Sequence, residues 1–445
     1  MIYSLLRATA RVALRWYYSN VTIVRAIGDE NLARGPLLVV VNHPNALVDV
    51  LVAADAVPRR LRFTGKATLF SNPVGSALLK WLGVVPLRRA SDEGGNADPS
   101  RNAESFEAIT RSLADGSAVL IFPEGKSHDD PSLAPLKTGA ARIALHGRDS
   151  GTVRGLRILP IGLVFEQKDQ PRSRALAILG ATIDVDGWTP PPGQPAPAAL
   201  TAEIDARLRS LTLNYATPAE ASVTARRASQ IAALLSEEAP SVGEAGSLEL
   251  RATVARAIGA FRSSAGDSAT RARAGAVEAR LDALQHSLDE HRVSLRDLAI
   301  SRDVTAGTWF VLRELAVLLV AGPIALWGWL NHYIPFHAAL VAGRRRRESA
   351  ADPAMRTIVA GAAFVSAMYL LQGALVALIF GPWWAIAYVI SLPIAADINL
   401  RFRERVTRAL RRARTYLFFR ANPTLHQQLL AEATALRAEI LSLAG

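Results

Sequence analysis

The sequence contains no cysteine. Disulfide bonds, thiolate metal sites and a cysteine nucleophile are therefore excluded. Acidic residues are scarce relative to basic ones, because 39 Asp and Glu stand against 51 Lys and Arg and leave a net charge of +12. This balance indicates an acidic partner, which could be nucleic acid, an anionic membrane surface or a phosphorylated substrate. Half of the 445 residues are hydrophobic, which favours the membrane over nucleic acid.

Motifs of several common enzyme classes are also missing. No Gly-x-Ser-x-Gly elbow occurs, so nothing supports a serine hydrolase of the α/β-hydrolase kind. Gly125-Lys126-Ser127 resembles the end of a phosphate-binding loop, but Leu120 stands where that loop needs its first glycine. The histidines show no metal-ligand spacing, and no nucleic-acid-binding motif is present. We therefore predict neither a metal site nor a nucleic-acid partner.

The N-terminal segment, residues 1–30, does not have the pattern of a secretory signal. Arg7, Arg11 and Arg15 interrupt its apolar residues, so no continuous apolar core forms. The segment is typical of a basic amphipathic helix. Such a helix either anchors the protein to a membrane surface or packs on the domain that follows.

Residues 31–190 alternate between apolar, strand-like runs and segments with helical spacing. This alternation predicts one α/β domain with a mixed, largely parallel sheet flanked by helices. The proline-rich stretch from Thr189 to Pro197 then predicts a stiff linker. The expected strands cover Leu37–Val41, Leu61–Thr64, Ala118–Phe122, Ile158–Phe165 and Leu176–Ile183.

Residues 200–303 are rich in Ala, Arg, Glu and Leu and are predicted to be helical. Apolar residues from Val277 to Leu298 alternate spacings of four and three, which is typical of a coiled-coil-like seam. Three roles stay open for this region: it packs on the preceding domain, dimerises or binds a partner.

Residues 307–400 contain apolar runs as long as the ~20 residues that a bilayer crossing needs. Gly322-Pro323 and Gly381-Pro382 interrupt these runs, so we predict a membrane region of two helical hairpins, each turned at a Gly-Pro pair. A buried helical domain is the alternative. The positive-inside rule predicts that the arginine run 344–347 and the basic helical tail, residues 401–445, are cytoplasmic. We thus expect an integral protein of the inner (cytoplasmic) membrane or an equivalent one, with its large segments on the cytoplasmic side.

His43 and Asp49 form the strongest candidate catalytic pair. They follow the apolar run 36–41, whose ladder Pro44 ends, so both leave the end of a buried strand, where ligands of α/β sheets usually bind. On one ideal helix they would lie roughly 240° apart. They can meet only if Pro44-Asn45 is irregular and a helix begins afterwards, with Asn45 as its N-cap. A histidine held by a carboxylate suits a general base, and the alternative is a histidine that caps a strand end.

Three further blocks follow the His43–Asp49 block along the chain. They are Gly83-Val84-Val85-Pro86-Leu87-Arg88-Arg89, Phe122-Pro123-Glu124-Gly125-Lys126-Ser127-His128 and Leu159-Pro160-Ile161-Gly162. In order and spacing the four blocks resemble the motifs of the glycerolipid acyltransferase family, which includes glycerol-3-phosphate and lysophosphatidate acyltransferases. The segments Gly65–Phe70 and Leu136–Arg142 also resemble that family. The resemblance covers residues 20 to 190.

The resemblance implies a role for each motif residue. His43 would be the general base and Asp49 the carboxylate that orients it. The implied substrate-site residues are Arg89, Lys66 and Lys126 for the acceptor's phosphate, Glu124, Gly125 and Ser127 for the acceptor-site motif, and Pro160 for the motif near the acyl donor.

Two departures from the family pattern stand out. Five residues separate His43 from Asp49, where family members usually have four. The Glu-Gly block continues Lys126-Ser127-His128-Asp129, where Thr-Arg is common. Both variants resemble the branch that acylates glycerol-3-phosphate and dihydroxyacetone phosphate, and Lys126 is our candidate for the missing arginine.

The implied reaction transfers a fatty acyl group from an acyl thioester of coenzyme A or acyl carrier protein to glycerol-3-phosphate or a related phosphorylated acceptor in phospholipid biosynthesis. The thioester is a co-substrate, and no cofactor is expected. A histidine base typically contributes ~10²–10⁴ in rate to such a step. The expected partners are the acyl thioester, the acceptor and membrane lipids. One alternative is acylation of lysophosphatidate or another lysophospholipid, and a second is a catalytically silent lipid-binding or scaffold protein.

Overall fold

The structure is a computed structural model that describes residues 2–25, 32–66, 76, 84–87, 99–236, 245–263, 268–300, 303–344 and 353–444. Its contacts divide the chain into two compact units. The first is built mainly from Met1–Ala221 and the second from Ser222–Arg346 and Arg356–Gly445.

An eight-stranded sheet forms the centre of the first unit, in the order β1-β7-β6-β2-β5-β3-β4 with β8 beside β6. The strands β2, β3, β4, β5 and β6 run parallel to one another, whereas β7 and β8 are antiparallel to β6, and β1 is parallel to β7. The mixed, largely parallel sheet of the prediction is thereby confirmed. The strands are β1 Asn20–Arg25, β2 Leu37–Val41, β3 Leu61–Lys66, β4 Val85–Leu87, β5 Ala118–Ile121, β6 Arg157–Phe165, β7 Arg174–Leu179 and β8 Ile183–Asp184.

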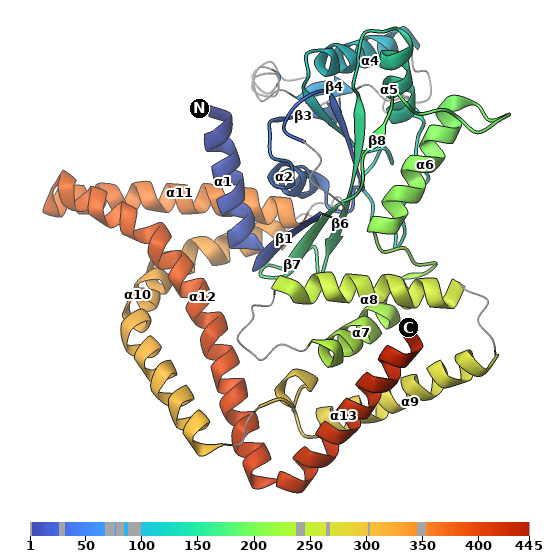
Figure 1. The fold of residues 1–445 in the computed structure, drawn as a ribbon. Coiled ribbons are helices and arrows are strands. Elements are labelled where there is room, and N and C mark those ends of the chain that lie inside the picture. The colour runs from blue at the N-terminus through green and yellow to red at the C-terminus, as the bar shows by residue number, and fades with distance from the viewer. Residues whose placement is uncertain are drawn as a thin grey trace. The chain divides into compact units, whose positions relative to one another are not determined.

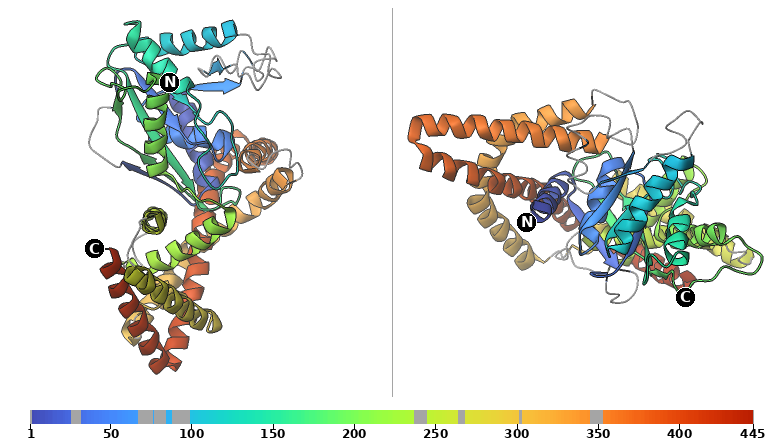
Figure 2. Two further views of the ribbon diagram at one scale, coloured as in Figure 1. Left: turned by 90° about the vertical axis from the view of Figure 1, so that its right-hand side faces the viewer. Right: turned by 90° about the horizontal axis from the view of Figure 1, so that it is seen from above.

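Helices cover both faces of this sheet. Figures 1 and 2 show α1 and α2 on one face and α4, α5 and α6 on the other. Since side chains alternate along a strand, Leu38 and Val40 of β2 pack into the core formed with α4–α6, and Val39 is buried on the opposite side. The helices are α1 Ile2–Tyr17, α2 Ala46–Ala56, α4 Pro99–Ala114, α5 Gly139–Asp149 and α6 Ala196–Leu211.

The N-terminal helix α1 packs on α2 of its own unit. Arg7 donates hydrogen bonds to the carbonyl oxygens of Asp55 and Val57 at 3.1 and 2.9 Å, and Arg11 pairs with the Asp55 carboxylate at 2.6 Å. A guanidinium at a helix C-terminus satisfies carbonyl groups that have no partner within the helix. Of the two predicted roles of this segment, these contacts support packing on the following domain.

The central strand β2 and its parallel neighbours end at the same edge of the sheet. Every residue of β2 is buried, as its apolar, β-branched sequence predicts. Because β2 lies between β5 and β6 and is parallel to both, the residues that follow all three strands emerge at the same edge. The ends of β3 and β4 reach this edge as well, since they continue the parallel order beyond β5.

The described part of the second unit is helical. It comprises most of α7 Pro218–Leu235, with α8 Ala245–Ser263, α9 Ser268–Glu290, the short 3₁₀ helix η3 Leu295–Asp297, α10 Val304–Arg344, α11 Pro353–Phe380, α12 Pro382–Ala421 and α13 Pro423–Ala444. The predicted seam is present on α9, where Val277, Leu281, Leu284 and Leu288 are buried against α13. It ends with α9, because Arg292 has a positive φ of 55° and η3 follows.

Three helices are long and apolar enough to cross a membrane: Val304–Ala342, Ala354–Phe380 and Pro382–Ala421. The predicted turn at Gly381 is present, since its φ of 93° separates α11 from α12. The predicted hairpin at Gly322-Pro323 is wrong, because Pro323 lies inside the continuous helix α10. Apolar sequence continues on both sides of this proline, and membrane helices tolerate a proline whose neighbours compensate for the missing hydrogen bond.

Candidate active site

The site begins where β2 ends. Asn42 extends the pairing of β2 with β6 through its side chain, which donates to the carbonyl of Leu163 at 3.0 Å and accepts from the Leu163 N–H at 2.7 Å. Pro44 cannot donate to a ladder, so the chain leaves the sheet here. His43 lies between Asn42 and Pro44, so its side chain is presented at the edge where the parallel strands end.

His43 and Asp49 meet at this edge, as the sequence predicts. The Nδ1 of His43 lies 2.9 Å from Oδ2 of Asp49, which is the fourth residue of α2 and fully buried. The imidazole stacks on Phe122, with ring centres 3.7 Å apart and planes at 9°. Its orientation is thus fixed by a carboxylate at one nitrogen and by an aromatic face beneath the ring.

An irregular start to α2 accommodates the five intervening residues. Ala46, the first residue of the helix, has a positive φ of 46°, a conformation that costs an alanine ~1–2 kcal/mol. Two hydrogen bonds hold this turn: the N–H of Asn45 donates to Asp49 at 2.7 Å, and the N–H of Ala46 donates to Oγ of Ser127 at 3.1 Å. Asn45 occupies the predicted N-cap position but makes no side-chain cap bond.

The side chain of Asn45 turns instead toward the N-terminal segment. Its Nδ2 donates to the hydroxyl of Tyr18 at 2.8 Å, and Tyr18 in turn donates to the carbonyl of Lys168 at 3.1 Å. Tyr18 is completely buried. The residue after α1 therefore supports the turn that carries Asp49.

Glu124 fastens the ends of β2 and β5 together. Its Oε1 accepts the backbone N–H of His43 at 2.7 Å, and its Oε2 accepts the N–H of Ala134 at 2.8 Å and contacts Nε2 of His128. The carboxylate is almost fully buried, with 3% of the residue exposed. Bonds of this kind to an ionised group are stronger than neutral ones, so Glu124 sets the position of the His43 backbone.

Burial has the largest effect on the pKa of Asp49. It raises the pKa of Asp49 above the ordinary value, although hydrogen bonds from His43 and Asn45 and the charge of Lys168 act in the opposite direction. Burial likewise lowers the pKa of Lys168, whose ammonium donates to the carbonyl of Pro44 at 2.7 Å and pairs with Asp129. The groups placed around Asp49 therefore offset part of the effect of burial on its pKa.

Gly125 takes a conformation that favours glycine. Its φ is 78°, and a Cβ at this position would lie 2.8 Å from Nζ of Lys137. Lys137 belongs to the segment Leu136–Arg142, which resembles the acyltransferase family, but the sequence predicts no role for this lysine. Lys126, the predicted substitute for the missing arginine, is exposed. The structure thus places a second cation, Lys137, directly against the Glu-Gly motif.

The remaining predicted residues are distributed as follows. Lys66 is the last residue of β3, and Arg89 lies outside the described residues. Pro160 is buried inside β6, where it is in register with Val40. A proline fits there because β6 pairs with β8 before it and with β7 after it, so its missing N–H falls between two ladders. His43, Asp49, Glu124 and Ser127 are thus joined by hydrogen bonds, whereas the described contacts do not connect Pro160 to them.

A cavity of about 310 Å³ opens at Asn42 and Pro44, the two residues that flank His43, and neither His43 nor Asp49 lines it. Glu124, His128 and Lys168 contribute its polar side, and Leu163 and Phe165 of β6 line its apolar side. Among the described residues, no group of three or more His, Asp or Glu is placed to hold a metal ion. The cavity can bind a ligand with polar and apolar parts, and a histidine held by a carboxylate, such as His43, can accept a proton.

Sequence reasoning missed Tyr18, Lys168 and Lys137. Tyr18 and Lys168 reach the site from segments far from it in the chain, and neither belongs to a motif with fixed spacing. Lys137 had a signal, because its segment resembles the acyltransferase family, but a single lysine between Leu136 and Thr138 looks like a solvated side chain in the sequence alone.

Comparison with known sequences relates the segment that carries this site to acyltransferases. Residues 23–164 match the family model described as Acyltransferase. The chain is 38% identical over 91 residues to glycerol-3-phosphate O-acyltransferase 2 of Saccharomyces cerevisiae, which is 20% of this chain and 12% of that protein. It is 35% identical over 80 residues to an uncharacterised acyltransferase of Schizosaccharomyces pombe and, over the same length, to glycerol-3-phosphate O-acyltransferase 1 of S. cerevisiae. These matches cover 18% of this chain and 12% and 10% of the two relatives.

Among solved structures, the chain is similar to the crystal structure of the 1-acyl-sn-glycerophosphate acyltransferase of Thermotoga maritima. The TM-score is 0.36 with 18% identity, over 47% of this chain and 77% of that one. The chain spans only about an eighth of the length of the curated relatives it matches. The segment that matches the family model contains the His43–Asp49 pair, Glu124 and Pro160. Residues 23–164 of this chain therefore form a domain of the acyltransferase family.

Proposed function

We propose that this protein is a membrane-bound acyltransferase that moves a fatty acyl group from a thioester of coenzyme A or acyl carrier protein to glycerol-3-phosphate or a closely related phosphorylated acceptor. One observation carries the proposal: Nδ1 of His43 lies 2.9 Å from the buried carboxylate of Asp49 at the ends of the parallel strands. Nε2 of His43 makes no hydrogen bond to any residue that the structure describes, so this nitrogen is available to a substrate.

The reaction needs a base because an alcohol is a weak nucleophile. Nε2 of His43 accepts the proton of the acceptor's hydroxyl as its oxygen attacks the thioester carbonyl, and a tetrahedral intermediate forms. The C–S bond then breaks, and the leaving thiolate takes the proton from the imidazolium. The ester and the free thiol are the products, and no acyl-enzyme is required.

Asp49 supports both states of the imidazole. With Nδ1–H donated to Asp49, the neutral ring keeps its lone pair on Nε2, and the carboxylate stabilises the positive charge that develops after proton transfer. The buried setting makes this interaction stronger than it would be in water. Glu124 and Ser127 act as positioning residues, because they bind the backbone of His43 and Ala46.

The acceptor's phosphate is assigned to the cations at the same edge. Lys66 ends β3, which is separated from β2 only by β5, so the strand ends are about 10 Å apart. β4 ends at Leu87, two residues before Arg89. Lys126 and Lys137 belong to the Glu-Gly side of the site. Charge-assisted bonds from such groups are typical of phosphate binding.

The three apolar helices support a reaction that takes place at a membrane surface. A fatty acyl chain and its lipid product partition into a bilayer, so a domain held at the membrane surface meets both there. The arginine-rich end of α12 follows the apolar part of that helix, and by the positive-inside rule this supports a cytoplasmic location for that end. We assign the catalytic domain to the cytoplasmic side of the inner membrane or an equivalent membrane. The acylation of glycerol-3-phosphate named for two of the relatives fits a phosphorylated acceptor.

The test uses the full chain in lipid nanodiscs. Acyl-CoA and acyl carrier protein thioesters are offered in turn with glycerol-3-phosphate, dihydroxyacetone phosphate or lysophosphatidate, and the ester and the released thiol are both measured. We expect acceptor-dependent release, lowered ~10²–10⁴-fold by His43→Ala. His146→Ala is the matched control, because His146 is an exposed histidine on α5 away from the site.

Three outcomes separate the alternatives. Preference for lysophosphatidate would replace the proposed acceptor with a lysophospholipid. Thiol release that is equal without any acceptor would identify a thioester hydrolase. Absence of turnover with every pair, in a protein that remains folded, would leave a lipid-binding or scaffold role.

A further inference from the structure

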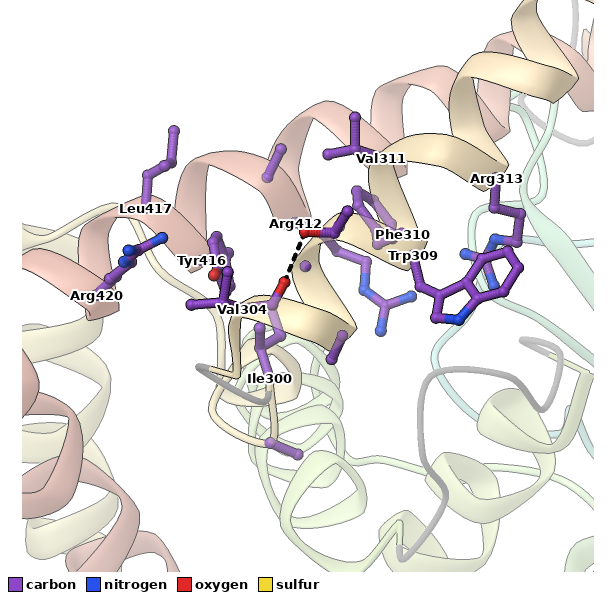
Figure 3. Close-up of a pocket in the computed structure, with 15 residues that line it drawn as sticks. Ile300, Val304, Trp309, Phe310, Val311, Arg313, Arg412, Tyr416, Leu417 and Arg420 are labelled. Carbon is purple, nitrogen blue, oxygen red and sulfur yellow. Dashed lines mark hydrogen bonds between the residues drawn. The ribbon is translucent and has the colours of Figure 1, made fainter.

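A second cavity lies in the helical unit, apart from the residues that the acyltransferase chemistry uses. It is a groove of about 860 Å³ between the beginning of α10 and the end of α12. Figure 3 shows its side chains coming from both helices. Its lining includes Val304, Trp309 and Phe310 of α10 and Arg412, Tyr416 and Arg420 of α12.

The groove lies at the polar end of an apolar helix pair. α10 and α12 are antiparallel, because Glu314 pairs with Arg405 at 2.8 Å and, further along α10, Asn331 accepts from the hydroxyl of Tyr388 at 2.6 Å. Apolar sequence occupies α10 beyond Glu314, whereas the groove lies before it. At 1.5 Å per residue the groove is within ~15 Å of the apolar segment, which is the depth of the lipid headgroups.

One of the three arginines that line the groove, Arg313, pairs with Glu314 at 2.8 Å, whereas Arg412 and Arg420 make no ion pair within the described residues. Arg412, Tyr416 and Arg420 are spaced four apart, so they share one face of α12. No carboxylate of the described residues lies within ion-pair distance of Arg412 or Arg420, and the guanidinium of Arg412 lies 6.0 Å from the centre of the Phe310 ring. Residues 401–421 contain eight arginines and one glutamate. The groove therefore attracts an anion.

The rest of the groove is apolar and open. Trp309 is 73% exposed, and Val311 and Leu417 also present most of their surface to the outside. A tryptophan and a tyrosine at this depth are typical of a membrane interface. Gly307 allows Tyr416 to cross close to α10, since a Cβ there would lie 2.9 Å from the tyrosine oxygen. Such a surface matches an amphiphile that carries a negative charge at one end.

We propose that this groove binds one anionic glycerophospholipid of the bilayer, with its phosphate between Arg412 and Arg420 and an acyl chain along Val304, Trp309 and Val311. The apolar lining and the membrane depth favour a lipid over a soluble phosphate. The inference concerns binding alone and does not depend on the proposed acyltransferase reaction.

The experiment measures lipid binding to the full chain purified in detergent, by native mass spectrometry with phosphatidylglycerol and with phosphatidylcholine. We expect one tightly held phosphatidylglycerol and weaker phosphatidylcholine binding. The double variant Arg412→Gln/Arg420→Gln should weaken phosphatidylglycerol about fivefold for each arginine, or about 25-fold together. Val311→Trp, which fills the groove without changing charge, should weaken it as well.

The matched control is Arg408→Gln/Arg414→Gln, which removes the same charge from the same helix outside the groove. It should change binding less than about twofold. An equal loss in the control would overturn the proposal in favour of diffuse attraction to a basic helix. Equal binding of phosphatidylcholine, or full competition by inorganic phosphate with no effect of Val311→Trp, would overturn it too.

Discussion

The backbone N–H of His43 donates a 2.7 Å hydrogen bond to the carboxylate of Glu124, a residue 81 positions further along the chain. This bond joins the segments that follow β2 and β5. The position of the His43 backbone is therefore set by a buried acid that follows a different strand, while Asp49 sets the orientation of the His43 ring. The two acids around His43 have separate tasks, and they respond differently to substitution.

Glu124→Gln should lower kcat about 10- to 100-fold with a smaller change in KM. The amide keeps one acceptor, but it cannot accept from both His43 and Ala134 as the carboxylate does, and a lost hydrogen bond to a charged group is worth about 1.5–3 kcal/mol. Steady-state kinetics with acyl thioester and acceptor measure the effect. Glu107→Gln on α4 is the control, since its side chain is remote from these bonds. Unchanged kcat in Glu124→Gln would refute a positioning role.

Asp49→Asn should reduce activity and yet gain stability relative to the wild type as the pH rises toward neutral. Burial raises the pKa of Asp49 above its ordinary value of 3.8, so the folded protein binds the proton more tightly than the unfolded chain does. The charged carboxylate therefore lowers the free energy of unfolding as pH rises above about 4, and the uncharged amide does not. Denaturation of both proteins from pH 4 to 7 should show a difference that grows with pH in favour of the variant. A difference that stayed constant, or that moved in favour of the wild type, between pH 4 and 7 would contradict this sign.

Much of the site could be predicted because it depends on local sequence. The apolar run before His43, the proline after it and the helical spacing from Ala46 onward predict a strand, a break and a helix, and these place Asp49 near the imidazole. The fold class follows in the same way from the alternation of strand and helix patterns. On α9, the spacing of apolar residues predicts the buried face that packs on α13.

What could not be predicted depends on tertiary contacts. No pattern indicates that Ala46 adopts a positive φ, because its N–H is held by Ser127 from a distant loop. Tyr18 and Lys168 reach the site only after the sheet has formed. Gly322-Pro323 has the composition of a turn, yet it lies in a helix apolar enough to cross a membrane, where a broken helix would leave unsatisfied backbone groups, and α10 continues through it.

Tyr18→Phe should destabilise the first unit by about 1 kcal/mol, because it removes the hydroxyl that bonds both Asn45 and the carbonyl of Lys168 and leaves only the 3.3 Å bond between those two groups. Chemical denaturation of the full chain measures the change. Tyr17→Phe is a close control: the Tyr17 hydroxyl is also buried but makes no hydrogen bond within the described residues, so its removal should cost nothing. Equal effects of the two variants would show that the Tyr18 hydroxyl does not support the Asp49 turn.

Gly328→Ala should disrupt the packing of α10 on α12, because a Cβ at this position would overlap the carbonyl of Ala395 in the backbone of the facing helix. Overpacking of this kind typically costs about 1–3 kcal/mol, and the backbone of a helix cannot rotate away as a side chain can. Gly322→Ala, on the same helix, should be neutral or stabilising, since its Cβ would make ordinary contacts of 3.7 Å with Leu318 and Phe402 and alanine favours the helix. Thermal unfolding of the detergent-solubilised chain, followed by circular dichroism, compares the two. If Gly322→Ala lowered the Tm as much as Gly328→Ala, close contact between the two helices at Gly328 would not be what stabilises the pair.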